Sequence, residues 1–455
     1  MSVKNEQVEK PQEEITDDIS DEKVEDSSAI EPEKLAELKA MMAKKQEKKM
    51  PARIIEKKRK SLKFGIVGTG QAGSRISSEF SRLGYTAVAF NTAPQDLEQI
   101  DLPDASKYLL EYGIGGAAKD VEVGHDAAET HREGIANVVA DHLADAQILV
   151  LCLSLGGGSG AGSHDVMIDV LAATGKPIVV MTVLPMSTEG AKTKKNALET
   201  LSSLAQLAAN KTISNLIVVD NAKLEAIYSD VSHMDFFSVG NKAIVDTIDK
   251  FNSFSSMSSL DKPFDPMEWA KVFVDGEGLC IYGEMTVSDY ADDNTAIAKA
   301  VIEGHDDGLL ASGFDLEQAK YASILIVGNE NVWKNIPRGS VDYALSVLQE
   351  RCPGAEEVYH GTYISDDETD AIKVYSIFSG LGLPDSRVTQ LRKEVEVEQS
   401  KTKERSKSRA TNLSLDTGKD KVVSKADEVR AKIAKNSSTF AQNFGKGKVM
   451  DYRKK

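Results

Sequence analysis

The glycine run Gly156–Gly162, which reads GGGSGAG, limits the fold more than any other segment. It follows an apolar segment of strand length at 146–153 and precedes residues 164–171, whose apolar spacing is helical. A glycine-rich turn between strand and helix exposes consecutive backbone N–H groups, and the helix N-terminus adds a partial positive charge. The run therefore predicts an anion site, most often for phosphate, and indicates that the chain handles a nucleotide.

Strand-like and helix-like segments alternate on both sides of this run. In the first half we expect strands at 64–67, 86–90, 148–153, 178–184 and 215–219, with helices at 74–83, 127–144 and 191–210. A long helical pattern around 241–251 leads to a second region, with strands at 278–282, 321–327, 357–364 and 371–378 and helices at 295–303 and 340–351. Such alternation predicts an α/β fold with a parallel, Rossmann-like sheet covered by helices, a long connecting helix and a second, smaller α/β domain.

Charge patterning suggests four parts. We expect a charged flexible arm at 1–61, a nucleotide-binding domain with the start of the connecting helix at 62–252, an acidic loop with the second α/β domain at 253–384, and a flexible tail with a basic end at 385–455. Blocky charge with few aromatic residues is typical of disordered arms. The net charge of −16 argues against a body that binds nucleic acid directly.

Composition also predicts the setting of the protein. No apolar run reaches membrane-spanning length, and the charged start is not a secretory signal. Cys152, Cys280 and Cys352 are far apart, which favours neither a disulfide framework nor a zinc site. We therefore expect a cytoplasmic protein with no direct membrane insertion and no metal held by a cluster of side chains.

Other glycine motifs have to be weighed against this interpretation. Gly68–Gly73 fits the GxGxxG pattern of dinucleotide folds, but that interpretation requires an acidic residue at the end of the second strand, where Phe90-Asn91-Thr92 stands. No Gly-Lys-Ser/Thr occurs, and Ser159 fails the nucleophile-elbow pattern because Ala161 replaces glycine. Phosphate binding by several glycine loops is favoured, and an NAD enzyme remains the minor alternative.

Six segments, taken in order, resemble the tubulin/FtsZ superfamily of GTPases. Gly156–Gly162 resembles its signature loop, with Ser159 at the threonine position. The other segments that resemble the family are Gly68–Arg75, Asn91–Leu97, Gly113–Gly124, Pro185–Gly190 and Val219–Leu224. The resemblance covers about 62–384 and implies binding of GTP and GDP with Mg²⁺. Phage- and plasmid-encoded, TubZ-like members and the bacterial division protein are the groups most similar in character.

The resemblance also implies roles for individual residues. Backbone groups of Gly157, Gly158, Ser159, Gly160 and Ala161 would cradle the phosphates, Gly70, Gln71, Ala72 and Gly73 would line the α- and β-phosphates, and Gly115, Gly116 and Ala117 would meet the γ-phosphate. Arg75 stands where the family often has Asn, and Asn91 belongs to the segment after the second strand. Glu189 would bind the ribose, Asn221 and Asn241 would read the guanine edge, and Phe237 would stack on the base or pack in the core.

Two positions depart from the division protein. Lys242 stands where that protein has Asp beside the base-reading Asn, which puts base selectivity in question. Thr193 stands where it has Arg near the phosphates, and Lys192 or Lys194 is expected to substitute.

The acidic segment Asp261–Trp269 resembles the family's catalytic loop. Asp265 and Glu268 fall on its two acidic positions, while Pro263 replaces an Asn. Phosphoryl transfer to water needs a positioned water and shielded phosphate charge, and a carboxylate pair can orient that water. In the family this loop enters the nucleotide site of the next subunit, so hydrolysis requires head-to-tail assembly into a filament. Without the resemblance, a solvated surface loop is the simpler interpretation.

The resemblance thus predicts a GTP-hydrolysing cytoskeletal protein whose main partner is a second copy of itself. The basic tail favours a role in positioning or segregating phage or plasmid DNA, with an adaptor protein bound to the tail and nucleic acid contacted only indirectly, in a host cytoplasm if the protein is phage-encoded. The alternatives are a non-polymerising structural or adaptor protein with the same fold, and a division protein of the FtsZ type.

Overall fold

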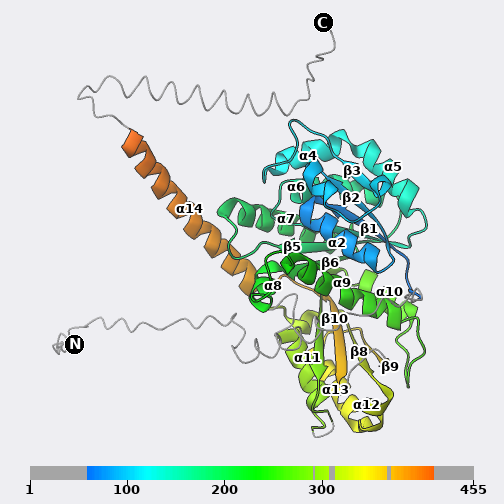
Figure 1. Ribbon diagram of the computed structural model, residues 1–455. Helices are drawn as coiled ribbons and strands as arrows, with labels where there is room; N and C mark the ends of the chain where they lie inside the picture. Colours follow the sequence, from blue (N-terminus) through cyan, green and yellow to red (C-terminus); the bar gives the residue numbers. More distant parts are fainter. Residues whose placement is uncertain (1–58, 291–292, 307–312, 366–369, 414–455) are drawn as a thin grey trace, which may run out of the picture.

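The computed structural model describes residues 59–290, 293–306, 313–365 and 370–413 (Figure 1). The expected flexibility of the arm up to residue 58 and of the tail from residue 414, with its basic end, lies outside these residues. Within them the chain forms a helix–sheet–helix sandwich with one long helix projecting from the body (Figure 1).

The sheet has ten strands in the order β3-β2-β1-β4-β5-β6-β7-β10-β8-β9. Their bounds are β1 Phe64–Thr69, β2 Thr86–Asn91, β3 Lys107–Leu109, β4 Ile148–Ser154, β5 Ile178–Leu184, β6 Asn215–Asp220, β7 Gly278–Val287, β8 Tyr321–Gly328, β9 Glu357–Ile364 and β10 Ile372–Leu381. All neighbours are parallel except β10, which runs antiparallel to both β7 and β8. The pairing of β6 with β7 continues the sheet from the first region into the second.

Helices cover both faces of this sheet because its strands are apolar on both sides. On β1, Val67 belongs to the core on one face and Ile66 to the core on the other. The face of Val67 is covered by α4 Val121–Thr130, α5 Arg132–Leu143, α6 Ser159–Ala172, α7 Ala191–Ala209, α11 Ala296–Asp306, α12 Glu330–Lys334, α13 Arg338–Arg351 and α14 Asp385–Leu413. The face of Ile66 is covered by α2 Gly70–Arg82, α3 Pro94–Glu98, α8 Asn221–Ile227, α9 Phe236–Phe254 and α10 Pro266–Val274. The α/β fold with its parallel first half is confirmed.

Two expected elements differ in the structure. The single helix expected at 127–144 is divided at His131, whose φ of −104° and ψ of 14° are not helical. The His131 ring contacts the carbonyl of Glu111 at 3.0 Å and the Tyr108 hydroxyl at 3.2 Å, so long-range contacts stabilise the break. The chain after residue 385 was expected to be flexible, but Asp385–Leu413 is helical, with Val388, Leu391 and Val395 buried.

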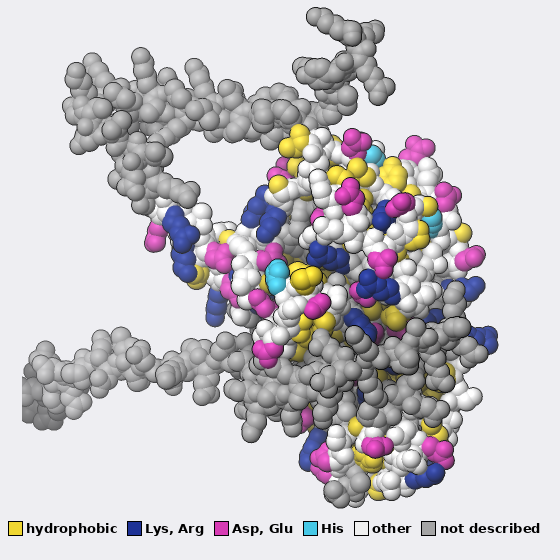
Figure 2. All heavy atoms as spheres, in the orientation of Figure 1, with side chains coloured by type: hydrophobic (Ala, Val, Ile, Leu, Met, Phe, Trp, Pro, Cys, Tyr) yellow, Lys and Arg dark blue, Asp and Glu magenta, His cyan; other side chains and the backbone are white. Residues whose placement is uncertain are grey.

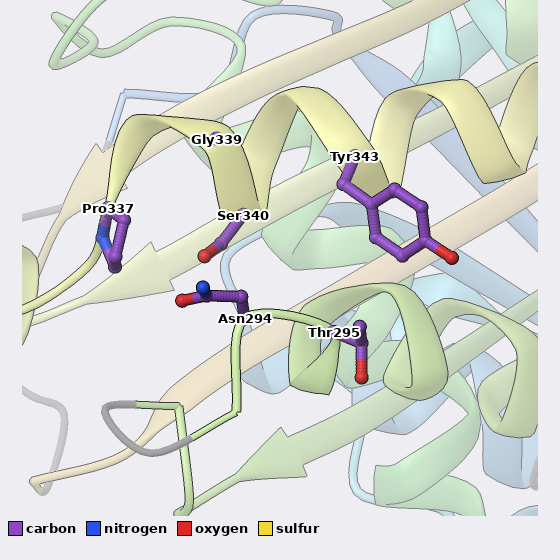
Figure 3. Close-up of a pocket in the computed structure, with 6 residues that line it drawn as sticks. All are labelled: Asn294, Thr295, Pro337, Gly339, Ser340 and Tyr343. Carbon is purple, nitrogen blue, oxygen red and sulfur yellow. The ribbon is translucent and has the colours of Figure 1, made fainter.

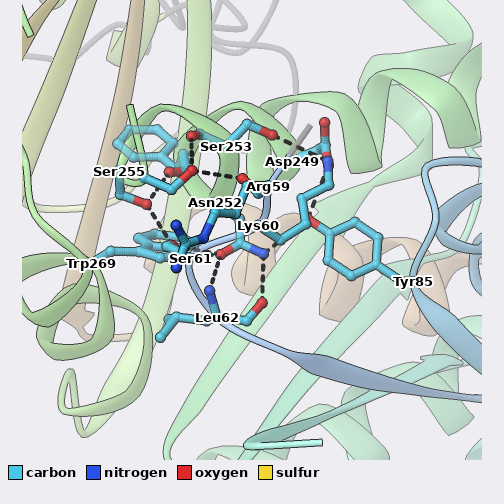
Figure 4. Close-up of polar contacts among 12 residues, drawn as sticks. Arg59, Lys60, Ser61, Leu62, Tyr85, Asp249, Asn252, Ser253, Ser255 and Trp269 are labelled. Atoms are coloured by element: carbon cyan, nitrogen blue, oxygen red, sulfur yellow. Dashed lines mark hydrogen bonds and ion pairs between the residues drawn. The ribbon is translucent and has the colours of Figure 1, made fainter. Parts of the chain in front are cut away.

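The first described residues are anchored on the end of α9 (Figure 4). The backbone N–H of Leu62 donates to the Asn252 side-chain oxygen at 2.8 Å, and the Asn252 amide donates back to the Leu62 carbonyl at 2.9 Å. Lys60 pairs with Asp249, which also accepts a hydrogen bond from the Tyr85 hydroxyl at 2.9 Å. Residues 60–62 are therefore fixed beside the amino end of β1.

Side chains of both signs are interspersed over the described surface that is visible in Figure 2, without a large patch of one sign. No helix of the described ranges is long and apolar enough to cross a bilayer.

Candidate nucleotide site and acidic loop

The loops after β1 and β4 approach so closely that only glycine fits between them. A Cβ atom on Gly70 would lie 2.8 Å from the Gly160 nitrogen, and one on Gly73 would lie 2.0 Å from the Cys152 carbonyl oxygen. Gly70 also has a φ of +70°, a conformation that glycine adopts readily. These glycines let two backbone segments, each opening a helix, come together in one surface, as the phosphate-binding prediction requires.

The segment before α4 closes a second side of the same surface. A Cβ atom on Gly158 would lie 2.7 Å from the Ala117 Cβ and 2.9 Å from the Asp120 nitrogen. The Gly116 N–H donates to the Thr92 carbonyl at 2.8 Å, and the Thr92 and Ser159 hydroxyls lie 2.6 Å apart. The expected γ-phosphate loop is therefore held between the β2 and β4 loops.

Asn91 does not point freely toward this surface. Its amide donates to Asp96 at 3.1 Å and its side-chain oxygen accepts from the Ala93 N–H at 3.2 Å. Gln71 donates to the same Asp96 carboxylate at 3.1 Å. Asn91 thus shapes the turn after β2, and Gln71 joins that turn to α2.

The residues expected to bind base and ribose lie on α8, on α9 and in the turn after β5. Asn221 opens α8 and Asn241 lies on α9, both half-buried. Phe237 is 38% exposed, which contradicts the alternative that it packs in the core. The Arg75 guanidinium lies 5.0 Å from the centre of the Phe237 ring, so the two form a cation–π pair. Glu189 closes its own turn by accepting from the Met186 N–H at 3.2 Å.

Lys119, which no sequence motif marks, lies in the same segment before α4. Its ammonium donates to the Thr193 hydroxyl at 3.0 Å and lies 3.6 Å from the Glu189 carboxylate. Its φ of +60°, next to Ala118 at +46°, is uncommon for residues other than glycine and marks a constrained loop. Glycine-rich composition drew attention to residues 113–117, but a strained backbone at lysine leaves no signal in sequence.

The lysines expected to replace arginine near the phosphates are placed differently. Lys192 is exposed, and the side chain of Lys194 is only 3% exposed and turned toward α14, where it pairs with Glu394 and Glu398. Lys119 is therefore the better placed cation, because it belongs to the loop that faces the glycine run.

The glycine loops fit the phosphates of a nucleotide. The close-packed glycines leave backbone N–H groups at two helix starts, which suits phosphate oxygens. In the part of the chain that the structure describes, no three His, Cys, Asp or Glu side chains converge on one point. Mg²⁺ is commonly held by phosphate oxygens and water, and in the expected site it would neutralise phosphate charge.

Asp265 and Glu268 lie on the side of the amino ends of the parallel strands, opposite the glycine loops. They begin α10, whose far end is fixed to the amino ends of two strands: the Asn215 amide of β6 donates to the Phe273 carbonyl at 2.9 Å, and the Phe273 ring stacks on Phe64 of β1 at 4.9 Å. The glycine loops follow the carboxyl ends of the same parallel strands. Six-residue β6 spans roughly 20 Å at about 3.3 Å per residue, so one chain cannot bring the two groups together.

The two acidic residues form a capping box. Asp265 accepts from the Met267 and Glu268 N–H groups at 2.7 and 2.8 Å, and Glu268 accepts from the Asp265 N–H at 3.1 Å. Partial burial raises the pKa of Glu268, against the opposing effect of the Asp265 N–H. They line a surface hollow with Lys262, Met267, Lys271, Glu357 and Tyr359.

A second hollow lies between the starts of α11 and α13 (Figure 3). Its lining residues are Asn294, Thr295, Pro337, Gly339, Ser340 and Tyr343. None of the residues expected to bind nucleotide or catalyse hydrolysis lines it, so it takes no part in the site.

Two family models match successive parts of the chain. Residues 63–229 match the tubulin/FtsZ family GTPase domain, and residues 262–385 match the C-terminal domain of the tubulin-like protein TubZ. The chain belongs to the tubulin/FtsZ family. As a tubulin/FtsZ protein it carries a GTPase domain that binds GTP and GDP.

Related tubulin/FtsZ proteins cover most of the chain. It is 27% identical over 365 residues to the tubulin-like protein TubZ of Bacillus cereus, and the aligned region covers 74% of this chain and 82% of that protein. It is 26% identical over 330 residues to the tubulin-like protein CetZ of Pyrococcus horikoshii, covering 70% and 85%. A crystal structure of a GTPγS-form protofilament of TubZ from Bacillus thuringiensis serovar israelensis shares the fold, with a TM-score of 0.68, 18% identity and coverage of 78% and 95%.

Proposed function

We propose that this tubulin/FtsZ-family GTPase assembles head to tail, so that Asp265 and Glu268 of one subunit complete the nucleotide site of the next. The observation that carries the proposal is their position across the sheet from the glycine loops. A contact between opposite ends of identical subunits is heterologous, and when its rotation does not close, it produces a filament. The TubZ protofilament and two-stranded filament structures that share this fold support assembly into a filament.

In this arrangement the groups have separate tasks. The glycine loops and Lys119 would hold the phosphates, with Mg²⁺ neutralising their charge, while Asn221, Asn241, Phe237 and Glu189 would bind the nucleoside. The incoming Glu268 carboxylate would accept a proton from the attacking water, and Asp265 would fix the start of α10.

A concentration series with GTP and Mg²⁺ tests the proposal, with light scattering and phosphate release followed together. We expect both signals to rise above one shared threshold concentration. Turnover per subunit that is independent of dilution, without scattering, would contradict assembly-dependent hydrolysis. A monomer with GTP and no turnover would support the alternative, a non-polymerising structural or adaptor protein.

We further propose that the filament positions or segregates phage or plasmid DNA through an adaptor protein bound to the basic tail, residues 414–455. The match of residues 262–385 to the C-terminal domain of TubZ supports this role over that of a division protein, since one TubZ structure with this fold is described as a plasmid segregation protein. Overall identity does not separate the two, because the cell division protein FtsZ 2 of Methanocaldococcus jannaschii is 26% identical over 352 residues. Deleting 414–455 should remove adaptor binding and preserve GTP turnover. Loss of turnover with retained adaptor binding would contradict this assignment.

A further inference from the structure

Helix α14 packs against the body through one stripe of its surface. Val388, Leu391 and Val395 are buried, and Arg387, Glu394 and Glu398 follow the same helical spacing. The polar members of the stripe are only partly exposed, because each meets a charged group of the body.

Arg387 forms a nearly buried ion pair with Asp220, the last residue of β6. Arg387 Nε lies 2.6 Å from Asp220 Oδ2 and Nη2 lies 3.2 Å from Oδ1, with the two side chains 12% and 8% exposed. Asp220 Oδ1 also accepts from the Ala222 N–H at 3.0 Å and so caps α8, the helix that begins with Asn221. The bidentate contact therefore fixes the carboxylate that orients the first turn of α8.

Lys194 makes the corresponding contact with the loop after β5. Its side chain is 3% exposed, and its ammonium donates to the Ser187 carbonyl at 2.9 Å and to Glu398 at 3.1 Å, and lies 3.0 Å from Glu394. Burial opposes the charge on Lys194, but the two glutamates outweigh it and raise the pKa of Lys194, so the ammonium stays charged. Ser187 precedes Glu189 in the same short turn.

The two contacts are parts of one network. Glu394 lies 3.7 Å from Arg387 as well as beside Lys194, and the Ser187 hydroxyl donates to Glu225 of α8 at 2.6 Å. Polar groups thus run from the start of α8, across α14, to the turn after β5 and back to α8.

We propose that α14 is a positioning element of the guanine-nucleotide site, in which Arg387, Glu394 and Glu398 hold the loops that carry Asn221 and Glu189. The inference rests on the proposed nucleotide-binding roles of those two residues. Because coupling between binding events is reciprocal, bound nucleotide stabilises the docked form of α14 to the same extent that docked α14 strengthens nucleotide binding. Arg387 touches neither base nor phosphate in this scheme and acts through Asp220.

Binding of fluorescently labelled GDP to the full chain, below the assembly threshold, tests this proposal. Removing one partner from a nearly buried ion pair leaves the other charge without compensation. Arg387→Gln is therefore expected to weaken GDP binding about tenfold or more, and Arg387→Lys to recover part of the loss. Arg392→Gln and Glu396→Gln, on the exposed side of α14, are the matched controls and should bind as the unchanged chain does.

A double-mutant cycle separates positioning from a general loss of stability. Asp220→Asn keeps an N-cap oxygen but removes the charge, so adding Arg387→Gln to it should weaken GDP binding little further. Hydrogen exchange across 385–398 should slow when GDP is added to the unchanged chain and respond less in Arg387→Gln. If folded Arg387→Gln binds GDP as tightly as the unchanged chain, this inference is overturned while the proposed nucleotide roles stand. Failure of the unchanged chain to bind GDP would overturn the proposed nucleotide roles and, with them, this inference.

Discussion

Gly73 of α2 lies directly against the carbonyl oxygen of Cys152 on β4, where a Cβ atom would come within 2.0 Å of that oxygen. Gly73 and the Cys152 carbonyl both belong to the backbone of the expected phosphate-binding surface, so neither can move without opening the β1 or the β4 loop.

Gly73→Ala should therefore destabilise the protein by roughly 3 kcal/mol, because overpacking against backbone cannot be relieved by a rotamer change. Urea unfolding measures this free energy. Gly339→Ala is the control, since nothing lies within 4 Å of its Cβ position and alanine favours the helix there. Equal unfolding free energies for the two variants would contradict the close approach.

Lys119→Met should lower the affinity for GTP about tenfold, as expected for the loss of one charged hydrogen-bonding group, and should affect GDP less. The reason is its place in the loop expected to meet the γ-phosphate. Lys192→Met, which removes an exposed lysine, is the control. Titration with labelled nucleotides gives both affinities, and a larger loss for Lys192→Met would assign the phosphate contact to that residue.

The pH at which GTP hydrolysis declines on the acid side should reflect the pKa of Glu268. Its carboxylate is the active form, and partial burial raises its pKa. As the pH is lowered, the hydrolysis rate should therefore begin to fall at a higher pH than it would with a glutamate of ordinary pKa. Phosphate release, normalised to the sedimented polymer at each pH, measures this decline. A decline at the ordinary glutamate value would argue against Glu268 as the proton acceptor.

The cysteines should be unreactive in the native protein. Burial raises the pKa of Cys352 to about 12 and raises the pKa values of Cys152 and Cys280 still further. Thiolate, not thiol, attacks disulfide reagents. A colorimetric thiol titration at mildly alkaline pH should detect almost no reaction before unfolding and all three thiols after it. Rapid reaction of the folded protein would contradict the burial of these side chains.

Much of the fold was predictable because burial on both faces makes strands apolar. Strands such as Ile178–Leu184 and Glu357–Ile364 agree with the structure at both ends. The glycine loops were also visible, since close approach of backbone requires that residue type. These loops meet because the carboxyl ends of parallel strands lie on the same side of a sheet.

The contacts that were missed join residues far apart in sequence. Arg387 and Asp220 are separated by 167 residues, and neither reveals a partner by local pattern. The stripe of α14 contains only three buried apolar residues, Val388, Leu391 and Val395, among many charged ones, so local composition predicts a polar tail. The break at His131 and the place of Lys194 have the same cause, since tertiary contacts override local composition.

Hydrolysis across the subunit junction is the central claim, and a mixing experiment tests it most directly. Glu268→Gln keeps a nucleotide site but lacks the proton acceptor, whereas Asn221→Ala/Asn241→Ala, verified to bind no GTP, keeps Glu268. Each variant alone should release almost no phosphate, and an equimolar mixture should release far more than the sum of the two. A mixture that co-sediments yet remains inactive, or Glu268→Gln with unchanged turnover, would contradict catalysis by the neighbouring subunit.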